Sequence, residues 1–256
     1  MEEEAAESDE KESDFLVIPA ISIRKRRVVV VNNGRYEPLT DVEDNELTLY
    51  DFVAMFLEEY STILVLDIDG IERRKPQLTQ IQTVAPLKNV WWDPGVRSLE
   101  DMMDTFTAGA NRVVVGTKSI WNLEELRSCQ EFSSDFVLSL DWADGILSRD
   151  ANISQADPID FLRDMHDEGV RRILFSQLGR VRSGSRIDTG FVREMRDASR
   201  RLYLGGSGFS LDTVREVERA NLGIRGIVVG VMDIIRDSLV EDQPDYDEGS
   251  VIHGEY

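Results

Sequence analysis

Eight short apolar runs alternate with amphipathic stretches along most of this chain, and no other feature of the sequence limits its fold as strongly. The runs begin at Phe15, Ile63, Asn89, Arg112, Phe136, Arg172, Leu202 and Gly226. They do not alternate strictly between polar and apolar residues, which is typical of strands buried on both faces. We therefore predict a parallel sheet whose strands are joined by helices.

Helical periodicity fills the intervals between the runs. Ser98, followed three residues later by Asp101, predicts a capping box at the start of one helix. Helices are predicted over 49–60, 76–86, 98–108, 122–131, 157–167, 188–200, 210–220 and 231–239. Eight strands interleaved with eight helices predict a single (β/α)8 TIM barrel over residues 15–236. A doubly wound open sheet is the alternative, because alternation alone does not show closure.

Two segments of the chain resemble each other. The stretches from Pro94 and from Ser207 each contain a glycine, a Ser-Leu-acid helix start, an apolar helix and a strand ending in Val-Val-Gly. The final glycines, Gly116 and Gly230, are 114 residues apart, which is about half of the globular length. This spacing predicts two similar half-barrels, and a chance match of two helix–strand units is the alternative.

The net charge of −20 is concentrated at the two ends of the chain. Residues 1–14 carry a net charge of −7, and residues 237–256 carry another −7. The remaining 34 acidic and 28 basic residues leave only −6 for the predicted barrel. We therefore predict two acidic disordered tails and a barrel that can still hold an anionic ligand.

Composition also excludes several classes of function. An acidic chain is a poor partner for nucleic acid or for an anionic membrane surface. No apolar run approaches the roughly 18 residues of a membrane span, and the polar N-terminus does not resemble a signal peptide. Cys129 is the only cysteine, which excludes an internal disulfide and argues against a cysteine-based metal site. We expect a cytoplasmic protein.

Glycine-rich turns follow the third and seventh predicted strands and lie directly before helices. Backbone N–H groups in such turns can approach an anion closely, and the helix N-terminus favours negative charge. We therefore predict two phosphate sites at the C-terminal ends of the strands, where TIM barrels carry their chemistry. Tight turns that bind no ligand are the alternative. The predicted phosphate-binding residues are Gly95, Arg97, Gly116, Thr117, Gly206, Ser207, Gly208 and Gly230.

At these positions the chain resembles the ProFAR isomerases of histidine biosynthesis and the related cyclase barrel. The matching motifs are IPAISIRKRRVVVV from Ile18, LVLDIDGI from Leu64, DPGVRS from Asp93, RVVVGTKSIWN from Arg112, VLSLDWADGIL from Val137 and GGSGFS from Gly205. The resemblance implies a TIM barrel that converts an aminoaldose into an aminoketose without a cofactor. It also implies a substrate with a phosphate at each end.

The resemblance further implies two catalytic aspartates, one ending the first strand and one ending the fifth. Asp141 matches the fifth-strand aspartate, but Ser22 stands at the first-strand position. An unassisted serine hydroxyl is a poor base near neutral pH. We predict Asp141 as the principal proton-transfer group, with a turn-forming role as the alternative. The candidate assisting groups are Ser22, Asp93 and Gln177.

Asp93 is a second departure from the family, which has a glycine there. Its carboxylate lies beside a predicted phosphate site, so it either replaces the missing acid or base or weakens phosphate binding. The loop after the sixth strand departs as well, because the family reads close to Thr-Asp-Ile and then Asp-Gly-Thr. Three arginines in this loop predict a different or additional anionic group: Arg180, Arg182 and Arg186.

Two further acids end the second predicted strand. Asp67 and Asp69 are two residues apart and are expected on one face. They are predicted either to pair with Arg24 or Arg73 or to contact substrate, and the sequence leaves both readings open.

We expect a divergent relative of the ProFAR isomerases that binds a small phosphorylated sugar or nucleotide-like metabolite, with no metal and no cofactor. A genuine ProFAR isomerase and a non-catalytic phosphometabolite-binding barrel are the alternatives. A second carboxylate within reach of Asp141 would favour an enzyme, because acid–base isomerisation needs two proton-transfer groups.

Overall fold

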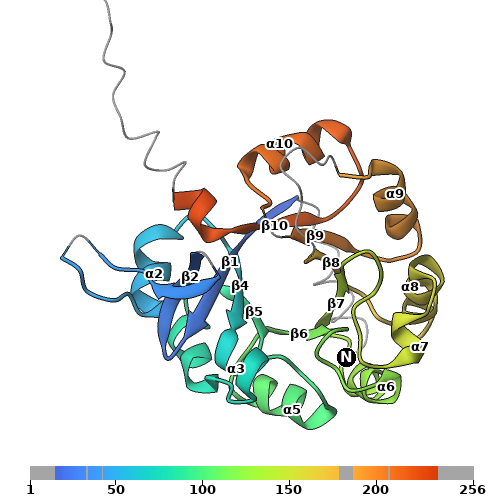
Figure 1. Ribbon diagram of the computed structural model, residues 1–256, viewed down its shortest axis with the longest axis horizontal. Helices are drawn as coiled ribbons and strands as arrows, with labels where there is room; N and C mark the ends of the chain where they lie inside the picture. Colours follow the sequence, from blue (N-terminus) through green and yellow to red (C-terminus); the bar gives the residue numbers. More distant parts are fainter. Residues whose placement is uncertain (1–14, 33, 42, 179–186, 207, 236–256) are drawn as a thin grey trace, which may run out of the picture.

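Eight parallel strands close into a barrel in the computed structural model of the chain (Figure 1). The strands are β1 (Leu16–Arg24), β4 (Thr62–Asp67), β5 (Asn89–Asp93), β6 (Arg112–Gly116), β7 (Phe136–Trp142), β8 (Ile173–Gln177), β9 (Leu202–Gly206) and β10 (Gly226–Gly230). Each pairs with the next along the chain, and β10 pairs with β1 with Ile18 opposite Val228. This last pairing closes the ring, which confirms the predicted TIM barrel and excludes the open sheet.

The structure describes residues 15–32, 34–41, 43–178, 187–206 and 208–235. Both acidic ends of the chain lie outside these ranges, so the tails predicted there stay predictions. The same holds for four predicted anion-binding residues: Arg180, Arg182, Arg186 and Ser207.

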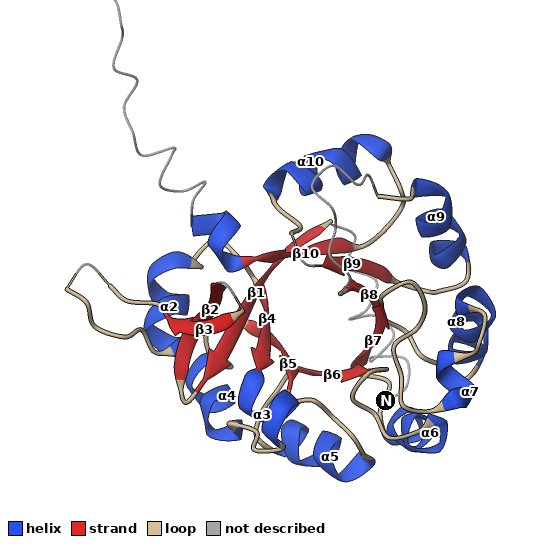
Figure 2. Ribbon diagram, viewed as in Figure 1, coloured by secondary structure: helices blue, strands red, loops and turns tan. Residues whose placement is uncertain are grey.

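Helices surround the barrel and cover its outer face (Figure 2). They are α2 (Leu49–Phe56), α3 (Ile68–Arg73), η1 (Leu78–Gln80), α4 (Ile81–Val84), α5 (Leu99–Thr107), α6 (Leu123–Phe132), α7 (Ala151–Ser154), α8 (Pro158–Asp167), α9 (Thr189–Asp197) and α10 (Leu211–Ala220). Thr48 caps α2, because its hydroxyl accepts a 3.2 Å hydrogen bond from the N–H of Asp51. Among the described residues, no helix is long and apolar enough to cross a membrane.

The start of α5 lies where the sequence predicts it, but the predicted capping box is wrong. Ser98 is the N-cap residue, yet its side chain makes no capping hydrogen bond. Asp101 instead accepts a 2.8 Å bond from the N–H of Arg97, one residue before the cap. The N–H of Leu99 donates to Glu125 of α6 over 3.0 Å, so a neighbouring helix satisfies the first turn of α5.

An antiparallel hairpin continues from β1 and is not apparent from the sequence. Its strands are β2 (Arg27–Asn32) and β3 (Arg35–Pro38). The chain reverses between β1 and β2 at Lys25 and Arg26, whose φ angles are +49° and +65°. The short helices α3 and α7 were also not predicted, and the helix expected over 76–86 is reduced to η1 and α4.

The barrel interior is filled by one buried apolar or aromatic side chain from each strand. These side chains are Ile18, Leu64, Trp91, Val114, Val137, Leu174, Tyr203 and Val228. Trp91 and Tyr203 meet edge to face with ring centroids 4.9 Å apart. The other face of each strand packs under the helices in a second, larger apolar cluster. The barrel is therefore a packed core, and a ligand can reach only its ends.

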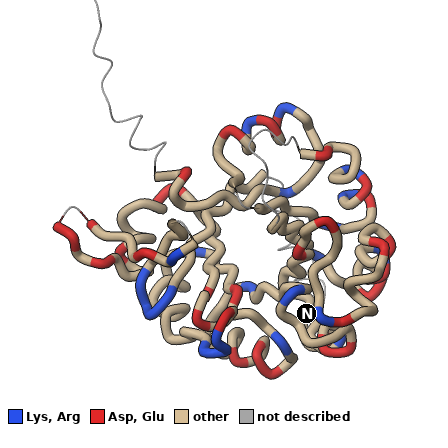
Figure 3. Tube along the Cα trace, in the orientation of Figure 1, with Lys and Arg blue, Asp and Glu red and all other residues tan. Residues whose placement is uncertain are grey.

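The two similar sequence segments occupy equivalent places in the ring. The unit β5–α5–β6 supplies the third and fourth barrel strands, and β9–α10–β10 supplies the seventh and eighth. They lie across the barrel from each other in Figure 1, as two half-barrels require. Residues of both charge signs are distributed around the outside of the ring rather than gathered on one side (Figure 3).

Candidate active site

Small and polar side chains follow the apolar layer towards the C-terminal ends of the strands. Because side chains alternate across a strand, the residue two positions after each inner-layer residue also faces the interior. These residues are Ala20, Leu66, Asp93, Gly116, Ser139, Ser176, Gly205 and Gly230. Most of these residues are small, and Asp93, Ser139 and Ser176 bring polar groups to the end of the barrel where TIM barrels carry their chemistry.

Asp141 stands two residues beyond Ser139 on β7 and is only 8% exposed. Its Oδ1 accepts a 2.9 Å hydrogen bond from the Ser139 hydroxyl, and its Oδ2 accepts a 3.0 Å bond from the N–H of Lys118. Its own N–H donates to the hydroxyl of Thr117 over 3.0 Å. Burial raises the pKa of Asp141, while the hydrogen bonds from Lys118 and Ser139 oppose that increase.

Asp93 supplies a second carboxylate to the mouth. Among the described residues, its hydrogen-bond donor is the N–H of Gly95, over 2.8 Å. Burial raises the pKa of Asp93 to about 7, and the negative charges of Asp141 and Asp67 add to the increase. The carboxylates of Asp93 and Asp141 therefore interact electrostatically, and Asp93 exchanges a proton near neutral pH.

The other two candidate assisting groups are placed differently. Ser22 shares the inner face of β1 with Ile18, and its hydroxyl makes no hydrogen bond with the described residues. No residue that the structure describes therefore accepts a hydrogen bond from this hydroxyl. Gln177 shares the outer face of β8 with Phe175, so Ser176 rather than Gln177 faces the interior.

Asp67 and Asp69 have structural partners. Asp67 accepts hydrogen bonds from the N–H of Gly70 over 3.1 Å and from both the backbone and the side chain of Gln77. Burial raises the pKa of Asp67, although the hydrogen bonds from Gln77 and Gly70 oppose the increase. Asp69 accepts a 2.6 Å bond from the N–H of Lys25 and pairs with Arg73 at 3.5 Å. The predicted pairing with Arg73 is therefore confirmed for Asp69.

The amides of the predicted phosphate-binding residues Gly95 and Thr117, and that of the neighbouring Lys118, are already bonded within the protein. The N–H of Gly95 donates to Asp93, and the N–H of Lys118 donates to Asp141. The N–H of Thr117 donates to the carbonyl oxygen of Ser139 over 2.9 Å. Gly116 packs directly beneath Asp141, because a Cβ at this glycine would lie 2.8 Å from Oδ2.

Arg97 joins the loop after β5 to the helix α3. Its guanidinium donates to the carbonyl oxygens of Gly95 over 2.6 Å, Ile71 over 2.7 Å and Gly70 over 3.4 Å. Burial lowers its pKa, and the nearby charge of Arg74 lowers it further. Arg97 therefore brings positive charge to the β5 side of the mouth, while its terminal N–H groups donate to backbone carbonyl oxygens.

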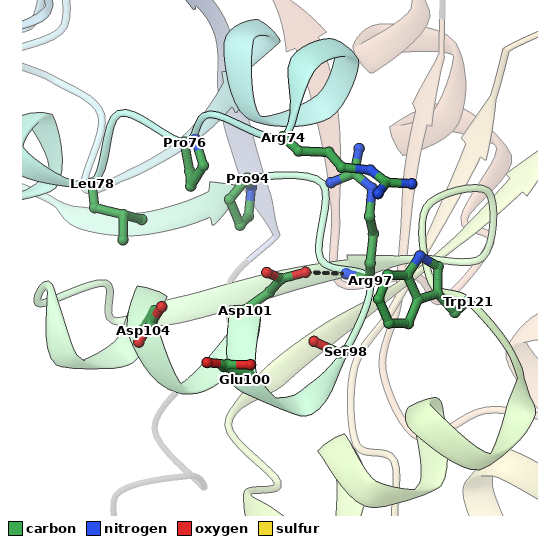
Figure 4. Close-up of a pocket in the computed structure, with 10 residues that line it drawn as sticks. All are labelled: Arg74, Pro76, Leu78, Pro94, Arg97, Ser98, Glu100, Asp101, Asp104 and Trp121. Carbon is green, nitrogen blue, oxygen red and sulfur yellow. Dashed lines mark hydrogen bonds between the residues drawn. The ribbon is translucent and has the colours of Figure 1, made fainter.

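A pocket of about 270 Å³ lies between α5 and the loop that follows α3 (Figure 4). Its polar lining combines two arginines with three acids of α5, and Pro76, Leu78, Pro94 and Trp121 supply apolar walls. In Figure 4 Arg74 and Arg97 lie close together at one end, and Arg74 lies 6.0 Å from the Trp121 ring. Neither Asp93 nor Asp141 lines this pocket, so it does not contain the two carboxylates of the mouth.

The second half-barrel offers freer backbone groups. Gly208, just before α10, has a φ of +87° and nothing within 4 Å of an added Cβ. Its N–H donates to no described residue. Gly206 is closely packed against Gln177, and Gly230 lies near Asp233, whose Oδ2 would be 3.5 Å from an added Cβ.

Ser139 is not among the predicted site residues, because it stands inside the apolar run FVLSL. The signal that finds it is the period-two spacing between Val137, Ser139 and Asp141, which places all three on one face. The same spacing from Leu174 assigns Ser176 to the interior.

Solved structures with similar folds come from other enzymes. The 3-keto-L-gulonate-6-phosphate decarboxylase of Vibrio cholerae superposes with a TM-score of 0.52 and 12% identity, covering 75% of this chain and 91% of that chain. A 3-hexulose-6-phosphate synthase superposes with a TM-score of 0.52 and 14% identity, covering 73% and 89% of the two chains. At these identities the likeness concerns the fold alone.

Sequence comparisons identify the family. The isomerase of Moorella thermoacetica named 1-(5-phosphoribosyl)-5-((5-phosphoribosylamino)methylideneamino) imidazole-4-carboxamide isomerase, a ProFAR isomerase, is 30% identical over 228 residues, covering 84% of this chain and 91% of the relative. The enzyme of the same name from Heliobacterium modesticaldum is 27% identical over 226 residues, with coverage of 84% and 91%. A family model described as "Histidine biosynthesis protein" matches residues 16–232. The chain therefore belongs to the histidine biosynthesis protein family, and its similar curated relatives are ProFAR isomerases.

Proposed function

We propose that this chain is an isomerase that converts a phosphorylated aminoaldose into the corresponding aminoketose by acid–base catalysis. The observation that carries the proposal is the pair of carboxylates at the barrel mouth, Asp141 and Asp93. Both have a raised pKa, and the charge of Asp141 contributes to the raised pKa of Asp93. Two interacting carboxylates with different surroundings can hold one proton between them, which gives one acid and one base.

The hydrogen bonds favour Asp141 as the base. Its two oxygens accept bonds from Ser139 and from the backbone of Lys118, and both bonds stabilise the ionised carboxylate. Asp93 accepts a single bond among the described residues, from Gly95, and its pKa of about 7 leaves it substantially protonated in neutral solution. Asp93 is therefore the acid of the pair.

The proposed reaction consists of proton transfers and bond changes within the substrate. Asp93 donates a proton to the ring oxygen of the sugar while the bond from C1 to that oxygen breaks and the amine nitrogen forms a double bond to C1. Asp141 then removes the proton from C2, which gives an enolamine. Loss of the proton from the C2 hydroxyl and protonation of C1 give the aminoketose, so the product is an isomer of the substrate. General acid–base catalysis of this kind contributes about 10²–10⁴ to the rate.

The pathway in which this reaction belongs is a separate question. A serine at the first-strand position and a carboxylate at Asp93 favour a divergent enzyme with its own substrate. The names of the curated relatives favour ProFAR itself as the second candidate substrate. The paired carboxylates speak against a third reading, a non-catalytic barrel, because a scaffold has no need of two interacting acids whose pKa values are raised.

The test is an isomerisation assay with the purified full-length chain, first with ProFAR and then with a panel of phosphorylated aminoaldoses. We expect turnover of at least one panel member, and a loss of about 10² or more in kcat for Asp141→Asn and Asp93→Asn. Asp160→Asn, which removes an exposed carboxylate on α8, is the matched control and leaves kcat unchanged. Turnover that survives Asp141→Asn would refute the assignment.

Complementation of a strain that lacks the ProFAR isomerase separates the two pathways. We expect no growth from this chain. Growth that is restored by this chain and abolished by Asp141→Asn would instead establish the histidine-pathway activity.

A further inference from the structure

The pocket between α5 and the loop after α3 carries opposite charges at its two ends (Figure 4). Arg74, Arg97 and Trp121 lie at one end, and Glu100 and Asp104 of α5 lie at the other. No ion pair within the described part of the chain joins Arg74 to either acid. Arg74 and the two acids therefore keep their charges without a counter-ion among the described residues.

Arg74 occupies a backbone position that suits glycine better than arginine. It is the C-cap residue of α3, with φ of 58° and ψ of 39° in the left-handed region. Glycine or asparagine is common at such helix ends, because a Cβ atom disfavours this conformation. The backbone gains nothing from arginine here, so any advantage of this residue type comes from its side chain.

The charge of Arg74 is also placed unfavourably. Burial lowers the pKa of Arg97, and the positive charge of Arg74 lowers it further, so the two guanidinium groups repel each other. Arg97 is held in place by its hydrogen bonds to the carbonyl oxygens of Gly95 and Ile71. An anion beside Arg74 would relieve the repulsion, and the planar fork of a guanidinium matches a carboxylate. The Trp121 ring, 6.0 Å from Arg74, forms the wall next to this position.

The acid end of the pocket has the complementary property. Glu100 and Asp104 are exposed and lie one turn apart on the same face of α5. Like charges at this spacing repel each other and destabilise a helix. Neither carboxylate accepts a hydrogen bond from a described residue. An ammonium group between them would therefore be bound favourably.

The size and the walls of the pocket limit the ligand further. Pro76, Leu78 and Pro94 form apolar walls. The volume of about 270 Å³ equals that of roughly nine water molecules in the liquid, which suits a small metabolite. The lining holds three acids and two arginines, so a singly charged carboxylate fits better than a doubly charged phosphate.

We propose that this pocket binds a small dipolar metabolite, with its carboxylate group beside Arg74 and its ammonium group between Glu100 and Asp104. The apolar chain that joins the two groups packs against the proline and leucine walls. Neither Asp93 nor Asp141 lines the pocket, so this ligand is bound apart from the two carboxylates of the proposed isomerase. The proposal therefore does not depend on that function.

Calorimetric titration of the full-length chain with three probes tests the proposal. The probe 6-aminohexanoate carries both charged groups and is of the required size. Hexanoate lacks the ammonium group, and hexylamine lacks the carboxylate. We expect 6-aminohexanoate to bind about tenfold more tightly than either of the other two, because only this probe satisfies both ends of the pocket.

Two variants assign the two ends. Arg74→Gly removes the charge and places at the left-handed position the residue that favours it, so unfolding does not explain a loss of binding. We expect this variant to bind 6-aminohexanoate about tenfold more weakly. Glu100→Gln combined with Asp104→Asn keeps the shape of the acid end, and we expect it to bind 6-aminohexanoate only as well as hexanoate. Glu216→Gln, at an exposed position of α10, is the matched control and changes no Kd.

Three outcomes would overturn the proposal. The first is that the unmodified chain binds none of the probes, and the second is that it binds hexanoate or hexylamine as tightly as 6-aminohexanoate. The third is binding of 6-aminohexanoate that Arg74→Gly and the double acid variant both leave unchanged, because the probe would then lie elsewhere on the chain. None of these results affects the assignment of Asp93 and Asp141, which the isomerisation assay tests separately.

Discussion

The hydroxyl of Ser139 donates a 2.9 Å hydrogen bond to Oδ1 of Asp141, two residues further along the same strand. Both residues face the barrel interior because side chains alternate along β7. The bond and the one from Lys118 to Oδ2 fix the orientation of the carboxylate at the mouth. Ser139 is therefore a positioning residue, since it acts on the substrate only through Asp141.

Ser139→Ala is expected to shift the pH dependence of catalysis as well as its rate. The lost hydrogen bond favours the ionised form of Asp141, so its removal raises the pKa of Asp141 further. The acid limb of the kcat/KM profile should move to higher pH by about one unit. Ser128→Ala on α6 is the control. A lower rate with an unmoved profile would show that Ser139 contributes only to packing.

Asp93 is expected to make the barrel less stable as the pH rises. Its folded pKa of about 7 lies above the unfolded value of 3.8, so the folded state holds the proton that the unfolded state releases between these values. Stability from this group is therefore greatest below about pH 4 and falls until about pH 7, by roughly 4 kcal/mol at most. Urea unfolding at pH 5 and pH 8 should show a smaller loss for Asp93→Asn than for the unmodified chain. An identical pH dependence in the two proteins would contradict the raised pKa.

Arg97→Ala is expected to destabilise the fold by about 2–4 kcal/mol, because it removes the hydrogen bonds from the guanidinium to the carbonyl groups of Gly70, Ile71 and Gly95. Arg97→Lys should recover only part of this loss, since an ammonium cannot reproduce the planar set of donors. Arg74→Lys is the matched control, because the Arg74 side chain lines the same pocket and donates no hydrogen bond to a described residue. Denaturant midpoints measure all three variants, and equal values for Arg97→Ala and Arg74→Lys would disprove the clamp.

The barrel strands could be predicted because each depends on a local pattern. An apolar run such as RVVVG at 112–116 is buried on both faces in any parallel barrel, so neighbouring elements need not be known. The hairpin after β1 could not be predicted in this way. Its position depends on the left-handed conformations of Lys25 and Arg26, residue types that rarely adopt them.

The residues of the candidate site also divide into those that a local pattern predicts and those that it does not. Asp141 could be assigned from its place at the end of a strand. The role of Arg97 could not, because its guanidinium binds carbonyl groups that lie about 26 residues earlier in the chain. The hydrogen bond from the N–H of Gly95 to Asp93 could not be predicted either. A glycine-rich turn has the same sequence whether its N–H groups are free or bonded. Contacts between loops decide these points, and no local pattern contains them.

Gly70 of α3 packs against the loop after β5, and its replacement should separate the helix from this loop. A Cβ at Gly70 would overlap the backbone carbonyl of Pro94, which cannot move as a flexible side chain could. Gly70→Ala is therefore expected to push the β5 loop outwards, weaken the bonds from Arg97 and shift Asp93, which directly precedes Pro94. We expect a stability loss of about 2 kcal/mol or more and a larger fall in kcat than in KM. Gly190→Ala in α9 is the control, since an added Cβ there would meet only the Asp188 side chain at 3.3 Å. A Gly70→Ala variant as stable and active as the unmodified chain would show that the helix and the loop are not held together at this point.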